Sequence, residues 1–117
     1  MLEKYPDVAF CFHPHNTHGT AVANTLAAIR AGISMVDSSA AGLGGCPFSP
    51  GASGNIATED LVDILQTMGY ETGVDLDVIL DAGRMIQGIV GHSDSATLKS
   101  GKIEDTVKQE VQRQKNG

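Results

Sequence analysis

The sequence is poor in several residue types that mark particular classes of protein. It has no tryptophan, aromatic residues make up 4% of its 117 positions, and it holds two cysteines. Cys11 lies in an apolar run and Cys46 among glycines, so these two settings favour reduced thiols in an intracellular protein over a disulfide framework. No apolar run approaches the ~20 residues of a membrane-spanning helix, and the first residues do not resemble a signal or transit peptide. We therefore expect no membrane partner.

Positive charge is also scarce over most of the chain. The formal net charge is −6, and only three of the eight lysines and arginines precede residue 99. A protein that binds nucleic acid needs a basic surface to face the phosphates. The composition therefore predicts no nucleic-acid partner.

Glycine and proline, in contrast, are concentrated in one segment. Residues 42–55 hold five glycines, two prolines and Cys46. Glycine adopts backbone angles closed to other residues and lets a loop approach a ligand closely. A long loop within a compact domain is usually functional or disordered. Composition alone leaves two interpretations open: a mobile loop that brings the Cys46 thiol to a substrate, or a flexible surface loop with an incidental cysteine.

Apolar patterning predicts an alternation of strands and helices. The expected elements are strands at 8–13 and 33–37, helices at 20–31, 58–68 and 75–90, and a weak amphipathic helix within 99–117. Thr58 and Asp75 are the expected N-caps, and Glu59 and Asp60 suit the positive end of the helix that Thr58 opens. A strand–helix–strand unit is right-handed and makes two parallel neighbours, so the predicted fold class is α/β.

Both unusual segments follow the predicted strands directly. His13-Pro14-His15 closes the first strand, and the glycine-rich loop follows the second. Ligands of parallel sheets collect at the carboxyl ends of strands. Since side chains alternate along a strand, His13 and His15 point to one side, ~7 Å apart. Two such imidazoles can bind one metal ion, or can make ordinary hydrogen bonds at a strand terminus. Asp37, at the end of the second strand, is a carboxylate whose role depends on geometry.

Five longer motifs carry a resemblance to a known family. They are His13-Pro14-His15-Asn16-Thr17-His18-Gly19, Val36-Asp37-Ser38-Ser39, Gly-Leu-Gly-Gly-Cys-Pro at 42–47, Gly-Ala-Ser-Gly-Asn at 51–55, and Ala-Thr-Glu-Asp-Leu-Val at 57–62. Together they resemble the C-terminal part of hydroxymethylglutaryl-CoA lyase, from about residue 6 to residue 91. The motifs at 42–47 and 51–55 are the most specific. The His-x-His-Asn segment is shared with related metal-dependent aldolases and acyl-CoA-condensing synthases.

The resemblance implies the C-terminal part of a (β/α)₈ TIM barrel, comprising its last two strand–helix units and C-terminal helices. Residues 1–91 would belong to the lyase domain, and residues 92–117 would form a polar, partly helical tail. A barrel of this kind needs about 250 residues, so we expect a fragment that requires the missing N-terminal part of the barrel or self-association. The family's Asp-Arg-Glu strand, which supplies another metal ligand and a substrate-binding arginine, has no counterpart in this sequence.

The resemblance also implies a reaction, the cleavage of hydroxymethylglutaryl-CoA to acetyl-CoA and acetoacetate. His13, His15 and Asn55 would bind a divalent cation, Mg²⁺ or Mn²⁺, and Cys46 would be the catalytic cysteine of a mobile loop that acts on an acyl-CoA substrate. The expected location is cytoplasmic in a bacterium, or mitochondrial in a eukaryote with a targeting segment upstream. Alternatives are a related aldolase or condensing synthase, and an inactive fragment or interaction module.

Overall fold

Strands and helices alternate at the start of the chain, and helices alone follow. The structure is a computed structural model in which residues 2–45 and 53–116 are described. In chain order the elements are β1 (Cys11–Phe12), η1 (Thr17–Gly19), α1 (Ala21–Arg30), β2 (Met35–Val36), η2 (Ala40–Gly42), α2 (Thr58–Thr67), α3 (Leu76–Val90), α4 (Ala96–Ser100) and α5 (Ile103–Asn116). This order confirms the predicted α/β class. None of the described helices is long and apolar enough to cross a lipid bilayer.

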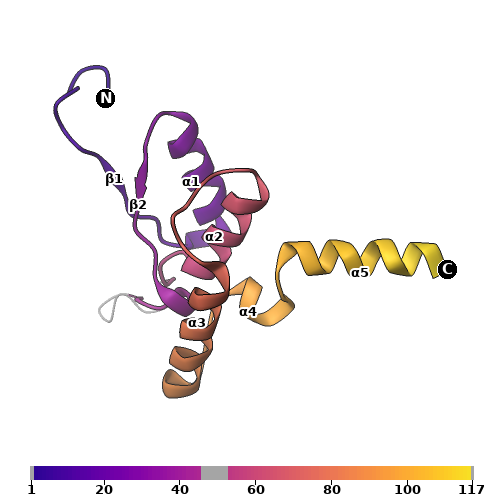
Figure 1. Ribbon diagram of the computed structural model, residues 1–117. Helices are drawn as coiled ribbons and strands as arrows, with labels where there is room; N and C mark the ends of the chain where they lie inside the picture. Colours follow the sequence, from indigo (N-terminus) through magenta and orange to yellow (C-terminus); the bar gives the residue numbers. More distant parts are fainter. Residues whose placement is uncertain (1, 46–52, 117) are drawn as a thin grey trace.

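The two strands are parallel neighbours joined by helix α1 (Figure 1). Their register pairs Cys11 with Met35 and Phe12 with Val36. Each strand is shorter than the sequence pattern predicts. The reason is that a strand extends only as far as its backbone pairs with a neighbour, and in the described part of the chain each strand has one.

Burial alternates along the first strand as the sequence predicts. Cys11, His13 and His15 are exposed, whereas Phe12 is half-buried and Pro14 is buried. The core on the covered side consists of side chains from α1, α2 and the segments next to them, namely Ala21, Ile56, Leu61 and Leu65 with Val22, Leu26, Ile29 and Val36 packed against them. The two histidines therefore lie on the open face of the strand pair.

Residues 53–57 return from the glycine-rich loop to the strand ends, and we call them the return segment. His15 and Asn55 form an antiparallel bridge, and Ser39 and Ala57 form a parallel one. The amide of Ile56 donates to the carbonyl of Pro14 at 3.2 Å, so the return segment is held from both sides. This pairing places Asn55 beside the His-x-His motif, 40 residues away in the sequence.

The helix caps match the sequence prediction at one helix and differ at another. Asp75 caps α3 as predicted, because its side chain accepts from the amides of Asp77 at 3.0 Å and Val78 at 3.3 Å. Thr58 is not the cap of α2 but its first residue, and the cap position is Ala57. Ala57 is extended and pairs with Ser39, and the helix begins at Thr58, one residue earlier than a threonine cap would place it.

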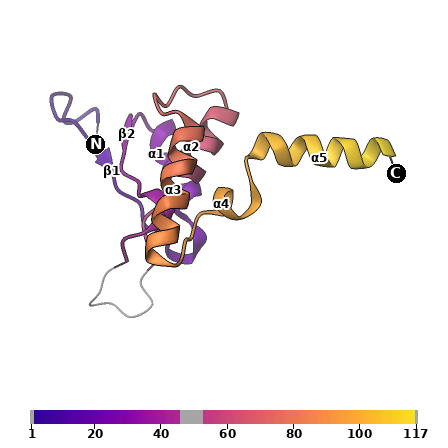
Figure 2. The same cartoon turned by 60° about the horizontal axis from the view of Figure 1, so that its bottom comes forward.

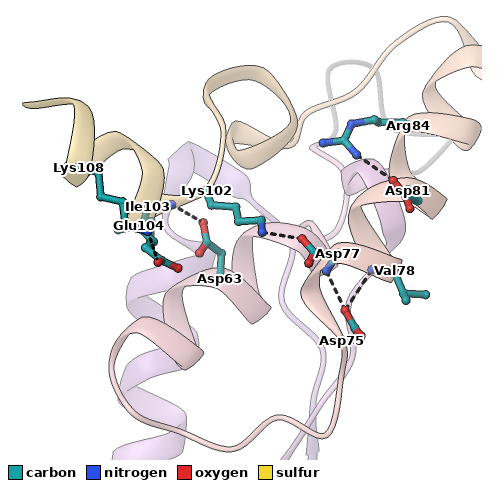
Figure 3. A network of polar contacts seen from close by, with 10 residues as sticks. All are labelled: Asp63, Asp75, Asp77, Val78, Asp81, Arg84, Lys102, Ile103, Glu104 and Lys108. Carbon is teal, nitrogen blue, oxygen red and sulfur yellow. Dashed lines mark hydrogen bonds and ion pairs between the residues drawn. The ribbon is translucent and has the colours of Figure 1, made fainter.

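Two aspartates of α2 attach the C-terminal helices to the rest of the chain. Asp60 accepts hydrogen bonds from the Ser95 hydroxyl at 2.8 Å and from the amides of Ala96 and Thr97 at the start of α4. Asp63 accepts from the amide of Ile103, the first residue of α5, at 2.9 Å (Figure 3). Beyond that anchor α5 extends away from the other elements (Figures 1 and 2) and buries none of its residues.

We predict that Asp63→Ala loosens the start of α5. Asp63 is 3% exposed, and its carboxylate fills the role of an N-cap for a helix that otherwise buries nothing. Loss of such a cap costs about 0.5–2 kcal/mol, so chemical denaturation should show that decrease and amide exchange should accelerate in the first turn of α5. Asp77→Ala removes the exposed ion pair with Lys102 (Figure 3) and should change little. Equal effects of the two variants would show that Asp63 does not anchor the start of α5.

Candidate functional site

The strand ends bring a histidine and an aspartate together. His13 and Asp37 each follow the last paired residue of their strand, and the Asp37 amide donates to the Phe12 carbonyl at 2.8 Å. His13 Nδ1 lies 3.0 Å from Asp37 Oδ2, and the Cys11 thiol donates to Asp37 Oδ1 at 3.2 Å. One carboxylate directly after β2 therefore contacts two side chains, Cys11 in β1 and His13 directly after it.

These contacts shift the acidities of the groups involved. The hydrogen bond from His13, followed by that from Cys11, holds the pKa of Asp37 below its ordinary value. The same carboxylate raises the pKa of the Cys11 thiol, chiefly through their hydrogen bond. An ionised carboxylate only accepts hydrogen bonds, so with Asp37 ionised the contact requires the proton on His13 Nδ1. In the neutral imidazole, Nε2 then carries the lone pair.

His15 is held by a different acceptor but presents the same atom. Its Nδ1 lies 2.9 Å from the backbone carbonyl of Ser53, in the return segment. Because a carbonyl only accepts, His15 must donate from Nδ1, and its Nε2 is left for another partner. The rings of His13 and His15 have centroids 5.3 Å apart, at an interplanar angle of 53°. Histidines that bind metals almost always donate their second ring N–H to a carboxylate or a carbonyl in this way.

Asn55 contributes an oxygen without a partner. Its side-chain amide donates from Nδ2 to the carbonyl of Leu43 at 3.0 Å, which fixes the orientation of the group. Its Oδ1 is buried and, among the described residues, is the single buried side-chain N or O atom that makes no hydrogen bond. A buried polar atom left in this state costs about 1–3 kcal/mol, so it indicates that another group binds there.

The glycines around Asn55 are required by close approach. A Cβ on Gly44 would overlap Asn55 Nδ2, and one on Gly54 would overlap the carbonyl oxygen of Gly42. Gly42 and Gly44 also have positive φ angles of 72° and 105°, where other residues are strained. Part of the glycine-rich motif is thus explained by the tight packing of the two ends of the loop. Cys46 lies outside the described residues.

The donors present fit a divalent cation. Two imidazole nitrogens and one amide oxygen belong to the ligand types of such ions, and the orphaned oxygen belongs to the residue that pairs with His15. Within residues 2–45 and 53–116, no group of three His, Cys, Asp or Glu side chains is placed to hold a metal. The donors that this chain would offer to such an ion are His13, His15 and Asn55, and a complete site would add further oxygens.

A buried carboxylate supports the base of the glycine-rich loop. Glu59 is 0% exposed, and its two oxygens lie 2.9 and 3.0 Å from the amide of Ala41 in η2. Ala41 has a φ of 59°, a left-handed conformation that is uncommon for alanine. Burial raises the pKa of Glu59. The hydrogen bond thus stabilises a strained turn two residues before Leu43, whose carbonyl orients Asn55.

Sequence analysis assigned no specific contact to Asp37 or Glu59. For Asp37 a signal was present, because parallel pairing of 12 with 36 makes 13 and 37 neighbours. For Glu59 the helix dipole gave a surface explanation, whereas the structure buries the side chain completely. No local pattern distinguishes a glutamate that faces solvent at a helix start from one that turns inward.

Comparison with known proteins identifies a family. The model of the HMGL-like family matches residues 1–86. The chain belongs to the HMGL-like family. Human mitochondrial hydroxymethylglutaryl-CoA lyase is 54% identical to it over 86 residues, and the cytoplasmic 3-hydroxy-3-methylglutaryl-CoA lyase of Rattus norvegicus is 50% identical over 86 residues. The HMG-CoA lyase of Acinetobacter baumannii, solved with coenzyme A and 3-methylmalate, superimposes with a TM-score of 0.76 at 44% identity.

These relatives are considerably longer than the part that this chain matches. The matched region is 74% of this chain but 26% of the human lyase and 25% of the rat one. The superposition on the Acinetobacter enzyme covers 81% of this chain and 32% of that chain. The chain thus spans about a quarter to a third of the HMG-CoA lyases to which it is similar, which are TIM barrels. The family resemblance seen in the sequence is confirmed.

We predict that Glu59 makes stability depend on pH. Because burial raises its folded-state pKa, the folded chain binds more protons than the unfolded chain from pH 4.5 upward. The free energy of unfolding should therefore fall as pH rises from 4.5 through the folded pKa. Glu59→Gln should lack this decrease. The free energy of unfolding of the wild type minus that of the variant should therefore fall as pH rises through that window.

The measurement is chemical denaturation at a series of pH values from about 4 to 8, spanning the ordinary glutamate range. Glu71→Gln, at an exposed position, controls for the loss of one negative charge. If the free energy of unfolding of the wild type minus that of Glu59→Gln rises with pH, the fold stabilises the ionised carboxylate, contrary to the prediction.

Proposed function

We propose that this chain supplies the metal-binding and thiol-bearing end of a carbon–carbon lyase that cleaves hydroxymethylglutaryl-CoA to acetyl-CoA and acetoacetate. The observation that carries the proposal is the buried, unpartnered Oδ1 of Asn55, the residue that pairs with His15, together with Nδ1 contacts that leave Nε2 of both histidines available. Membership of the HMGL-like family and similarity to HMG-CoA lyases support the choice of reaction.

His13, His15 and Asn55 would hold the cation from this side of the site. When bound, Mg²⁺ or Mn²⁺ would lower the pKa of the substrate's tertiary hydroxyl and orient the bond that breaks. The chain's own contribution is preorganisation, because each of the three side chains is oriented by a hydrogen bond from an atom other than the proposed donor. Asp37 fixes His13, the Ser53 carbonyl fixes His15, and the Leu43 carbonyl fixes Asn55.

The thiol of Cys46 would move the proton that completes the reaction. In a retro-Claisen cleavage the tertiary hydroxyl loses its proton as the carbon–carbon bond breaks, and the bonding pair passes into the enolate of acetyl-CoA. That enolate carbon must then take up a proton. We assign its delivery to Cys46, because the glycine-rich segment that carries it begins and ends beside Asn55.

The substrate partner we propose is an acyl-CoA. A relative was solved with coenzyme A, and this chain has few basic residues to hold the CoA phosphates before residue 99. We therefore place the phosphate contacts on the remainder of the barrel, which also covers the open face that carries the histidines. Activity would then require that remainder or self-association. We propose a cytoplasmic location in a bacterium and a mitochondrial one in a eukaryote.

We predict that His13→Ala and Asn55→Ala each weaken Mn²⁺ binding at least 10-fold. Both remove a donor whose orientation the structure fixes, and the binding can be followed by the loss of the free Mn²⁺ signal in electron paramagnetic resonance. His18→Ala is the matched control, because His18 is exposed in η1 and lies outside the proposed donor set. If His18→Ala weakens binding as much as His13→Ala, the assignment is wrong.

We predict that Cys46→Ser, in the complete barrel, lowers turnover about 10²–10⁴-fold, the range for loss of a general acid or base. Binding of Mn²⁺ should stay near the wild-type value, because the thiol is not among the proposed donors. Cys11→Ser controls for loss of the chain's other thiol. Turnover of Cys46→Ser at the wild-type rate would exclude the proton-transfer role.

A further inference from the structure

The carboxylate of Asp37 belongs to the strand end but is not a donor in the proposed cation site. It follows β2 directly, and in the parallel register it lies next to His13. Its two oxygens have separate partners, His13 Nδ1 on Oδ2 and the Cys11 thiol on Oδ1. A carboxylate engaged on both oxygens by side chains of the neighbouring strand is not oriented as a metal ligand.

The contact with His13 decides which ring nitrogen carries the proton. A histidine in water places its proton mainly on Nε2, and the hydrogen bond made by one ring nitrogen decides which of the two is protonated in a protein. With Asp37 Oδ2 at 3.0 Å from Nδ1, the proton is held on Nδ1 and the lone pair lies on Nε2. His15 reaches the same state through a backbone carbonyl, so only His13 depends on a side chain that can be mutated.

We propose that Asp37 is a positioning residue that holds the proton of His13 on Nδ1 and thereby presents Nε2 to the site before any ligand binds. The inference rests on the proposed function for the identity of the ligand but not for the tautomer, which is a property of the protein without metal. The thiol of Cys11 occupies the other oxygen and steadies the carboxylate, so its removal should matter much less.

The first test is nitrogen NMR of the histidine rings in ¹⁵N-labelled, metal-free protein, either the 117-residue chain or the chain assembled with the rest of the barrel. The spectrum is recorded near pH 8.5, about two units above the ordinary histidine pKa. In wild type and Asp37→Asn, whose amide oxygen still accepts, His13 should be protonated on Nδ1. In Asp37→Ala it should shift toward the Nε2-protonated form, and in Cys11→Ala it should not change. The ring of His15 and the backbone amides of β1 and β2 report whether the fold is kept.

The second test is Mn²⁺ titration of the same four proteins. Removing a partner that orients a metal-binding histidine typically costs 10–100-fold in affinity, so Asp37→Ala should fall in that range. Asp37→Asn should recover most of the loss, and Cys11→Ala should stay within about twofold. A merely structural role would move the His15 ring and the β1 and β2 amides as well and would not be rescued by asparagine.

Three outcomes overturn the inference. His13 protonated on Nε2 in wild type would show that the Asp37 contact does not set the tautomer. An unchanged tautomer in Asp37→Ala would show that another group holds the proton. An unchanged tautomer in Asp37→Asn with Mn²⁺ binding abolished would make Asp37 a direct ligand. Absence of Mn²⁺ binding in the wild-type chain assembled with the rest of the barrel would overturn the proposed function, and the tautomer result would then decide the role of Asp37.

Discussion

The parallel pairing of β1 with β2 is the constraint on which the site depends. Two residue pairs and the hydrogen bond from the Asp37 amide to the Phe12 carbonyl fix the register. A shift by one residue would turn each side chain to the other face, taking His13 away from Asp37 and burying it among helices. Both the metal-binding interpretation and the role of Asp37 therefore rest on a very short ladder, which is held in place by the covered core on its other face.

The return segment also positions residues of the proposed site. It brings Asn55 to the histidines and supplies the carbonyl that holds His15, so the position of the loop and the orientation of a ring are physically coupled. Two buried side-chain oxygens, one on Glu59 and one on Asn55, differ in whether they have a partner. The Glu59 carboxylate is paired with the Ala41 amide and supports the fold, whereas the Asn55 oxygen has no partner and indicates a ligand.

The open face of the strand pair is where we propose that the rest of the barrel completes the site. HMG-CoA lyases are three to four times longer than the region they share with it. In the proposed complete site, the residues described here orient a cation and a thiol, and the remaining barrel supplies the further ligand and the phosphate contacts. The C-terminal helices attach through Asp60 and Asp63 to the first two turns of α2, and the segment before α4 donates from the Asp94 amide to the Ala41 carbonyl at the base of the loop.

The sequence by itself determined the alternation of strands and helices, the Asp75 cap, the shared face of His13 and His15 and the family, because each of these depends on local periodicity or on a contiguous motif. Only the tertiary structure decided that Asp37 accepts from His13, that Glu59 is buried against Ala41 and that Asn55 Oδ1 lacks a partner. The two contacts join residues 24 and 18 positions apart, and, like the position of Asn55, they are set by strand register and by the path of the returning loop. The length of the strands and the cap of α2 were mispredicted for the same reason: both depend on which backbone groups find a neighbour.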